Sequence, residues 1–156
     1  MYDLHCYNNA GLLKPSFAIY LAMVFGVKNL LLIFIPFFGS LKGGGGLDYL
    51  YDYVNLKFLW LDAITLLLWI ALLTRSHNQI KMFRVIWLNG RGLLLFVISI
   101  GIIESIMSNF IFQKSYQHNF DLKVFYLIFI QSILVLNLIT SKYVKDLFMD
   151  WDKAKH

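Results

Sequence analysis

Three ionisable residues lie inside long apolar stretches of this sequence, and they are the residues best placed to do chemistry. They are Lys28, Asp62 and Glu104. A charged side chain at the centre of a bilayer costs about 2.5–3.5 kcal/mol, so such residues either pair with one another or mark a transport pathway. A structural pair of Lys28 with Glu104 or Asp62 is favoured over a proton relay or polar substrate site, because a relay needs a continuous polar path. A third alternative is that Asp62 lies close enough to the outer interface to reach water.

The composition explains why these residues are expected in a membrane. Of 156 residues, 59% are hydrophobic and 15% are charged, whereas an ordinary soluble domain is roughly 45–50% apolar and about 25% charged. One core of this size cannot bury so much apolar side chain, since about 30% of its surface would still face water. The composition therefore argues against a soluble domain, and the single cysteine excludes a disulfide-stapled secreted module.

Four segments are long and apolar enough to cross a bilayer. A spanning helix needs about 20 apolar residues, because the hydrocarbon layer is about 30 Å thick and each helical residue rises about 1.5 Å. We predict spans at residues 17–38, 56–73, 93–112 and 124–141. The expected fold is an all-α integral membrane protein: a four-transmembrane-helix bundle with a short interfacial C-terminal helix, forming one membrane domain over residues 1–156.

The basic residues that flank these spans predict their orientation. Nine lysines and arginines lie on the side of the two termini and four on the opposite side, while Lys28 lies within a span. Short cytoplasmic loops retain basic residues, so both termini are expected in the cytoplasm. The net charge of +5 is then a sign of topology, and no nucleic-acid partner is expected. Lys14 and Arg91 are predicted to contact lipid phosphates of the inner leaflet.

The depth of the three intramembrane groups follows from this topology. Counted from the outer ends of their spans, Lys28, Glu104 and Asp62 lie 10, 8 and 6 residues deep. A spread of four residues corresponds to about 6 Å along a helix. We therefore expect the three side chains to meet in the outer half of the bundle.

Small residues form a face on each of two predicted helices. The face on the first helix consists of Ala18, Ala22 and Gly26, and that on the third consists of Gly101, Ser105 and Ser108. Such small-xxx-small faces let two membrane helices approach closely. The face on the third helix also carries Glu104, so we expect helix contacts at both faces and the carboxylate at one of them.

Three other segments have recognisable patterns. Val144, Leu147, Phe148 and Trp151 form an apolar stripe that predicts a C-terminal helix on the inner membrane surface, either as an anchor or as a docking helix for another protein. Asn89 and the glycines after it predict a break before the third span. An amphipathic turn is expected over residues 47–54 and a glycine hinge over residues 43–46.

No arrangement of residues in the sequence indicates catalysis or metal binding. Ser-His-Asp, Cys-His and paired-carboxylate patterns are not visible. His5 and Cys6 are adjacent, but the other three histidines are scattered over both sides of the predicted membrane. We therefore expect no enzymatic activity, no metal and no cofactor.

The residues before the first span resemble a known family. Residues 7–15, Tyr-Asn-Asn-Ala-Gly-Leu-Leu-Lys-Pro, are similar to the leader of the uncharacterised bacterial inner-membrane proteins typified by enterobacterial inner membrane protein YfeZ. Lys28 stands at the family's basic position midway along the first helix, where arginine is more usual. Asn8 stands where the family has an aspartate. The resemblance covers the leader and the first span, and it implies a four-helix inner-membrane protein of unestablished function.

Three functions remain open from the sequence. The leading hypothesis is a non-enzymatic accessory or scaffold subunit of a membrane complex, as a homo-oligomer or with a membrane-protein partner, that uses the small-residue faces for helix contacts. The alternative is a small transporter or proton-coupled permease that uses Lys28, Asp62 and Glu104. A third hypothesis is an immunity-type protein that guards the membrane against a toxin.

Overall fold

The computed structural model describes residues 2–8, 11–41, 58–75, 81–110 and 122–151, with the backbone alone for residues 36–41, 108–110 and 122–124. Within these ranges the chain is helical and forms no β-strand, as the sequence predicts. In chain order the elements are the 3-10 helix η1 (Leu4–Cys6), α1 (Phe17–Gly26), α2 (Lys28–Leu41), α3 (Leu59–Thr74), α4 (Lys81–Leu88), α5 (Gly90–Phe110), α6 (Leu122–Thr140) and α7 (Lys142–Met149).

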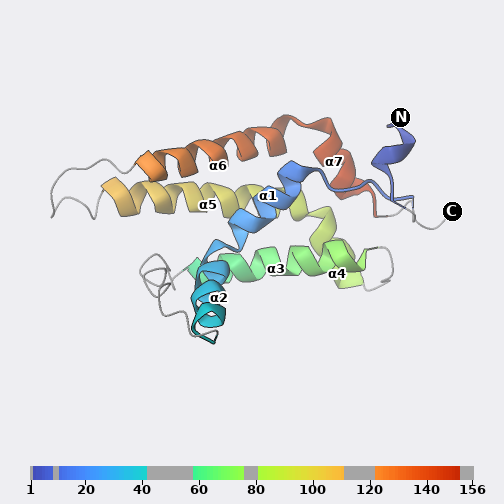
Figure 1. Cartoon of the computed structure of the whole chain (residues 1–156). Coiled ribbons are helices and arrows are strands. Elements are labelled where there is room, and N and C mark those ends of the chain that lie inside the picture. Colours follow the sequence, from blue (N-terminus) through green and yellow to red (C-terminus); the bar gives the residue numbers. More distant parts are fainter. Residues whose placement is uncertain (1, 9–10, 42–57, 76–80, 111–121, 152–156) are drawn as a thin grey trace.

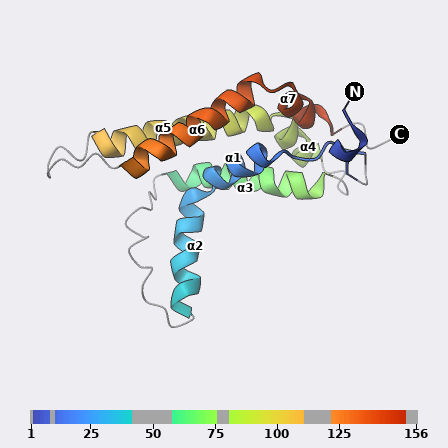
Figure 2. The same ribbon diagram turned by 45° about the horizontal axis from the view of Figure 1, so that its top comes forward.

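Four helices make up the body of the molecule. In Figure 1, the axes of α3, α5 and α6 are roughly parallel and α1 crosses between them obliquely, while α2 leaves this group steeply, as Figure 2 shows more clearly. α5 packs against α6, and α1 contacts α3, α5 and α6. The described part of the leader, residues 2–8 and 11–16, lies at the same end of the bundle as α4 and α7 (Figure 1). We call this the terminal end of the bundle.

The first predicted span is interrupted, which corrects the prediction of one continuous helix over residues 17–38. α1 ends at Gly26, α2 begins at Lys28, and the two meet at 70°. The N–H of Val27 donates to the carbonyl of Val24 at 3.2 Å, which tightens the last turn of α1. The N–H of Leu30 donates to a carboxylate oxygen of Asp62 at 2.7 Å, whereas in a continuous helix it would donate to the carbonyl of Gly26. A polar group from another helix therefore stabilises the break.

The fourth predicted span also ends in a bend. α6 and α7 meet at 68°, and Ser141 between them caps α7 by accepting a hydrogen bond from the N–H of Val144 at 3.3 Å. The short C-terminal helix is present as predicted. Its apolar stripe is buried in the protein itself, against α4 and α5, so the prediction that the stripe rests on the membrane surface is wrong. The stripe pairs with Trp87, whose ring centroid lies 4.7 Å from that of Phe148.

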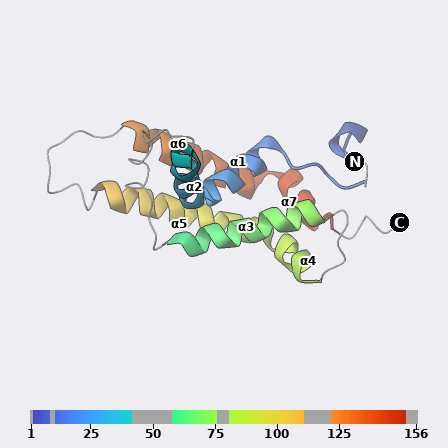
Figure 3. The ribbon, with the colours of Figure 1, turned by 60° about the horizontal axis from the view of Figure 1, so that its bottom comes forward.

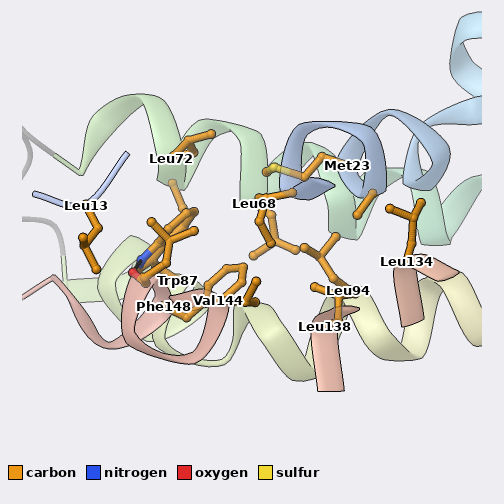
Figure 4. Close-up of a cluster of buried hydrophobic side chains, with 14 of the residues drawn as sticks. Leu13, Met23, Leu68, Leu72, Trp87, Leu94, Leu134, Leu138, Val144 and Phe148 are labelled. Atoms are coloured by element: carbon orange, nitrogen blue, oxygen red, sulfur yellow. Dashed lines mark hydrogen bonds between the residues drawn. The ribbon is translucent and has the colours of Figure 1, made fainter. Parts of the chain in front are cut away.

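A group of buried apolar side chains extends from the middle of the bundle to its terminal end (Figure 4). It includes Met23 of α1, Leu68 and Leu72 of α3, Trp87 of α4, Leu94 of α5, Leu138 of α6 and Phe148 of α7. Six of the seven α-helices in the described ranges therefore share one core. α2 contributes none of its described side chains to it.

Membrane-spanning capacity differs among the helices. Among the described residues, α5 is by itself long and apolar enough to cross a bilayer, and each of the two bent pairs could form one further span. α3 is apolar but has 16 residues. The predicted break before the third span is confirmed, since α4 ends at Leu88 and α5 begins at Gly90. The glycine hinge at residues 43–46 and the turn at 47–54 lie outside the described residues.

Candidate functional site

The break between α1 and α2 brings the three ionisable residues of the predicted spans toward one region. Lys28 is the first residue of α2, and its Nζ donates to Oε2 of Glu104 on α5 at 2.8 Å. The side chains of Lys28 and Glu104 are 26% and 11% exposed. Because the two residues are 76 positions apart, the ion pair joins the start of α2 directly to α5.

Asp62 has a different role from the other two. It lies in the first turn of α3, is 1% exposed, and accepts hydrogen bonds from Nδ2 of Asn29 at 3.2 Å and from the N–H of Leu30 at 2.7 Å. The first N–H groups of a helix have no partner within the helix, and the helix dipole favours a negative charge there. Asp62 thus caps α2 from a neighbouring helix.

Close packing of α1 on α3 positions this polar cluster. A Cβ added at Gly26 would lie 2.5 Å from Oγ1 of Thr65, a distance that real side chains do not tolerate. Thr65 is buried one turn after Leu61, to whose carbonyl its hydroxyl donates at 3.2 Å. Glycine at position 26 therefore lets the end of α1 lie against the residues that follow Asp62. Of the other predicted small residues on this helix, Ala22 is buried in the core and Ala18 packs against it.

The small face of α5 contacts α6. A Cβ added at Gly101 would lie 3.5 Å from Nε2 of Gln131, which is ordinary contact, and the Ser105 hydroxyl donates to the carbonyl of Gly101 at 2.8 Å. Gln131 is buried, and its Oε1 has no hydrogen-bond partner among the described residues. Ser108, the third predicted member of this face, has a side chain outside the described part of the structure.

A second polar cluster, which the sequence did not reveal, lies at the terminal end. Asp150 Oδ2 accepts a hydrogen bond from the N–H of Leu13 at 2.6 Å, and Nη2 of Arg75 donates to the carbonyl of Leu13. The Arg75 guanidinium lies 5.2 Å from the centroid of the Trp87 ring, within range of a cation–π interaction. Arg75 is 5% exposed and Asp150 is 1% exposed. We call Leu13, Arg75, Trp87, Tyr143 and Asp150 the clasp.

Burial sets the electrostatics of the clasp. It lowers the pKa of the Arg75 guanidinium from its ordinary value, while the charge of Asp150 acts in the opposite direction. Burial also raises the pKa of the Tyr143 hydroxyl, which donates to the carbonyl of Lys14 at 2.6 Å. Arg75 and Asp150 thus bind the carbonyl and the N–H of Leu13, and Tyr143 binds the carbonyl of Lys14. These contacts fix the leader to α3 and α7.

The two residues predicted to contact lipid phosphates have protein partners as well. Arg91 donates from Nε to the carbonyl of Leu138 at 2.7 Å and from Nη2 to that of Ile139 at 2.6 Å. A cation at these last carbonyls of α6 is favoured by the helix dipole. Lys14 Nζ donates to the carbonyl of His5 at 3.1 Å. Contact with lipid phosphates stays a prediction for both residues.

The chemistry available at the α1–α2 break is that of paired charges. The cluster formed by Lys28, Asn29, Asp62 and Glu104 joins α2 to α3 and α5 through an ion pair and a carboxylate cap. These contacts can lock α2 in its position at the break.

Comparison with protein families gives one match over nearly the whole chain. A family model described as "Protein of unknown function (DUF2919)" matches residues 2–150. The matched range includes the leader, both polar clusters and α7. No curated protein and no solved structure gave a match.

Proposed function

The chain belongs to the DUF2919 family, whose function is unknown, and we propose that it is a small multi-pass inner-membrane protein that acts as an accessory or scaffold subunit of a membrane complex. In this proposal the bent α1–α2 pair, α3, α5 and α6 form a four-span bundle with both termini in the cytoplasm. The proposal includes the closer likeness to the YfeZ type of inner-membrane protein, which rests on the leader residues.

The outward surfaces of three helices support a location in the bilayer. The exposed large apolar side chains include Leu66, Leu67, Ile70 and Leu73 on α3, Phe96, Ile103 and Met107 on α5, and Phe129, Ile133, Leu136 and Ile139 on α6. Soluble monomers rarely expose apolar patches larger than a few hundred Å². The hydrocarbon chains of lipids would cover these surfaces and avoid the free-energy cost of exposing apolar side chains to water. α3, with a length of about 24 Å, would need a locally thinned bilayer.

The distribution of charge supports the orientation. The exposed or partly exposed basic residues at the terminal end are Lys14, Lys81, Arg84, Arg91, Lys142 and Lys145. Cytoplasmic flanks of membrane helices are enriched in such residues. The leader and α7 lie at the same end, as an even number of spans requires.

The observation that carries the proposal is the 2.8 Å contact between Lys28 and Glu104. An intramembrane charge that is neutralised by a partner on another helix fixes which helices touch and needs no substrate to explain it. The cap that Asp62 provides to α2 likewise fixes α2 against α3. The exposed apolar exterior is the surface that can contact other membrane proteins.

Photo-crosslinking in native membranes tests this role. A photoreactive residue at Ile103, which is exposed on α5, should capture a second copy or a distinct membrane protein in a defined ratio. The matched control places the same group at Leu94, which is buried on the same helix and should give no adduct between chains. A protein that gives no adduct from Ile103 and migrates as a monomer would contradict the proposal.

Transport is the second candidate, because one observation favours it. Secondary transporters bind ions and substrates at discontinuous helices, and the α1–α2 break places polar groups from α2, α3 and α5 together. The test is proton uptake into proteoliposomes under an imposed membrane potential, followed with an entrapped pH-sensitive dye. Uncoupled proton transport requires uptake by the wild type and its loss in Glu104→Gln with the fold retained. Proton uptake by wild-type vesicles no faster than by empty vesicles would exclude it.

A further inference from the structure

Helix α4 has two different faces. On one face Trp87 is fully buried, donating from Nε1 to the carbonyl of Leu147 at 3.2 Å, and Phe83 and Ile86 pack against the core. The opposite face carries exposed apolar side chains: Met82 and Val85 are 55% and 58% exposed. Packing against the core therefore explains the apolar residues on one side of α4 and does not explain those on the other side.

Two basic residues share this exposed side of the helix. At 100° per residue, Leu88 lies between Arg84 and Lys81 around the helix axis, and Val85 and then Met82 follow on the far side of Lys81. All five are exposed. A helix whose exposed side carries apolar residues next to lysine and arginine is typical of segments that lie in the boundary between lipid headgroups and acyl chains. The positive charges make an anionic surface the matching partner.

The position of α4 agrees with such a boundary. α4 lies at the edge of the bundle, beside the end of α3 and next to the start of α5 (Figure 3). This is the terminal end, where α7 exposes two more cations, Lys142 and Lys145. If the bundle spans the bilayer as proposed, α4 lies at the level of the cytoplasmic headgroups.

We propose that the exposed face of α4 binds anionic phospholipids of the cytoplasmic leaflet. Lys81 and Arg84 contact the phosphate groups, while Val85 and Met82, on the far side of Lys81, enter the acyl boundary. The inference rests on the proposed membrane location and adds a lipid class and a surface to it. α4 then anchors the ends of α3 and α5 at the interface, in place of the C-terminal stripe, which is buried in the core.

Intact-complex mass spectrometry in mild detergent tests this inference. The full chain is titrated with phosphatidylglycerol or phosphatidylcholine, and the bound lipids are counted. The wild type should prefer phosphatidylglycerol. Each charge removed from α4 should weaken phosphatidylglycerol binding about fivefold, so Lys81→Gln/Arg84→Gln should weaken it about twenty-fivefold. The matched control Lys142→Gln/Lys145→Gln removes the same charge from α7 and should change the affinity less than threefold.

The possible outcomes separate the inference from the proposal beneath it. Equal losses in the two double variants would show a general effect of charge and would overturn the assignment to α4. Unchanged phosphatidylglycerol binding in Lys81→Gln/Arg84→Gln would also overturn the assignment to α4. A protein partner would then be the alternative ligand of this face. A wild type that fails to insert into vesicles of either lipid would refute the membrane location itself. Should the double variant fold poorly, Lys81→Gln alone provides the same comparison.

Discussion

The polar cluster at the α1–α2 break and the clasp at the terminal end differ in what their charges contact. At the break, the charge of Lys28 meets that of Glu104 at 2.8 Å. In the clasp, Arg75 and Asp150 act mainly on the backbone of Leu13. The first arrangement fixes helices against one another, while the second fixes an irregular leader onto the helices. Two kinds of polar contact therefore hold this bundle at two levels, one within the predicted membrane region and one beside it.

The largest effect is expected in the clasp. Arg75→Met removes the guanidinium that donates to Leu13 and leaves the carboxylate of Asp150 buried without this cation. Removing one member of a buried charged group costs about 3–5 kcal/mol. Denaturant unfolding in detergent should show a loss of this size, and adding Asp150→Asn should recover part of it. A loss as small as that of Lys145→Gln, an exposed control, would mean that the clasp contributes little.

Loss of the cap on α2 should have the next largest effect. Asp62→Leu leaves the N–H of Leu30 and the amide of Asn29 without their acceptor, at an expected cost of about 2–3 kcal/mol. Asp62→Asn retains one acceptor oxygen and should cost about half as much. Unfolding curves of the two variants check this order. Equal stability of Asp62→Leu and the wild type would show that α2 needs no cap from α3.

Close packing at the terminal end is tested by two neighbouring glycines. A Cβ at Gly90 would lie 2.5 Å from Cε1 of Phe148, whereas a Cβ at Gly92 meets nothing within 4 Å. Gly90→Ala should therefore cost about 1–2 kcal/mol through overpacking, and Phe148→Leu should relieve it. Gly92→Ala, the matched control, should be neutral or stabilising because alanine favours helix. Equal thermal stability of the two variants would contradict the close contact of α5 with α7.

The smallest effect concerns pH. Because burial raises the pKa of Tyr143 above its ordinary value of 10.0, the folded state holds this proton more tightly than the unfolded chain does. The stability that this proton gives to the folded state is fully present below pH 10 and is lost as the pH rises through the raised pKa. Tyr143→Phe should be about 1 kcal/mol less stable at neutral pH, since it loses the hydrogen bond to Lys14. Its unfolding temperature should then fall less steeply than that of the wild type above pH 10. Parallel slopes would place Tyr143 outside the clasp.

The sequence predicted the break cluster better than the clasp for a physical reason. Lys28 and Glu104 are conspicuous because charges are rare in apolar segments, and their depths could be compared by counting residues. Arg75 and Asp150 lie where charged residues are common. Their partners are the N–H and carbonyl of Leu13, which every residue carries, so the residue types give no sign of the contact.

The bends were harder to predict than the helices. Hydropathy marks apolar stretches, and it correctly indicated helices in all four predicted spans. It does not show that a carboxylate 32 residues away will take the N–H of Leu30, which is what stabilises the break after Gly26. The stripe on α7 has the same spacing whether it faces lipid or Trp87, so its partner is decided by tertiary packing.

A double-mutant cycle at Lys28 and Glu104 tests most directly whether the break cluster is a structural lock. Lys28→Met, Glu104→Gln and the double variant would be unfolded by denaturant in the same lipid–detergent mixture as the wild type. We expect each single change to destabilise the bundle and the double change to recover part of the loss, with a coupling energy of about 1–3 kcal/mol. Additive losses, with a coupling energy near zero, would contradict a structural role for the pair.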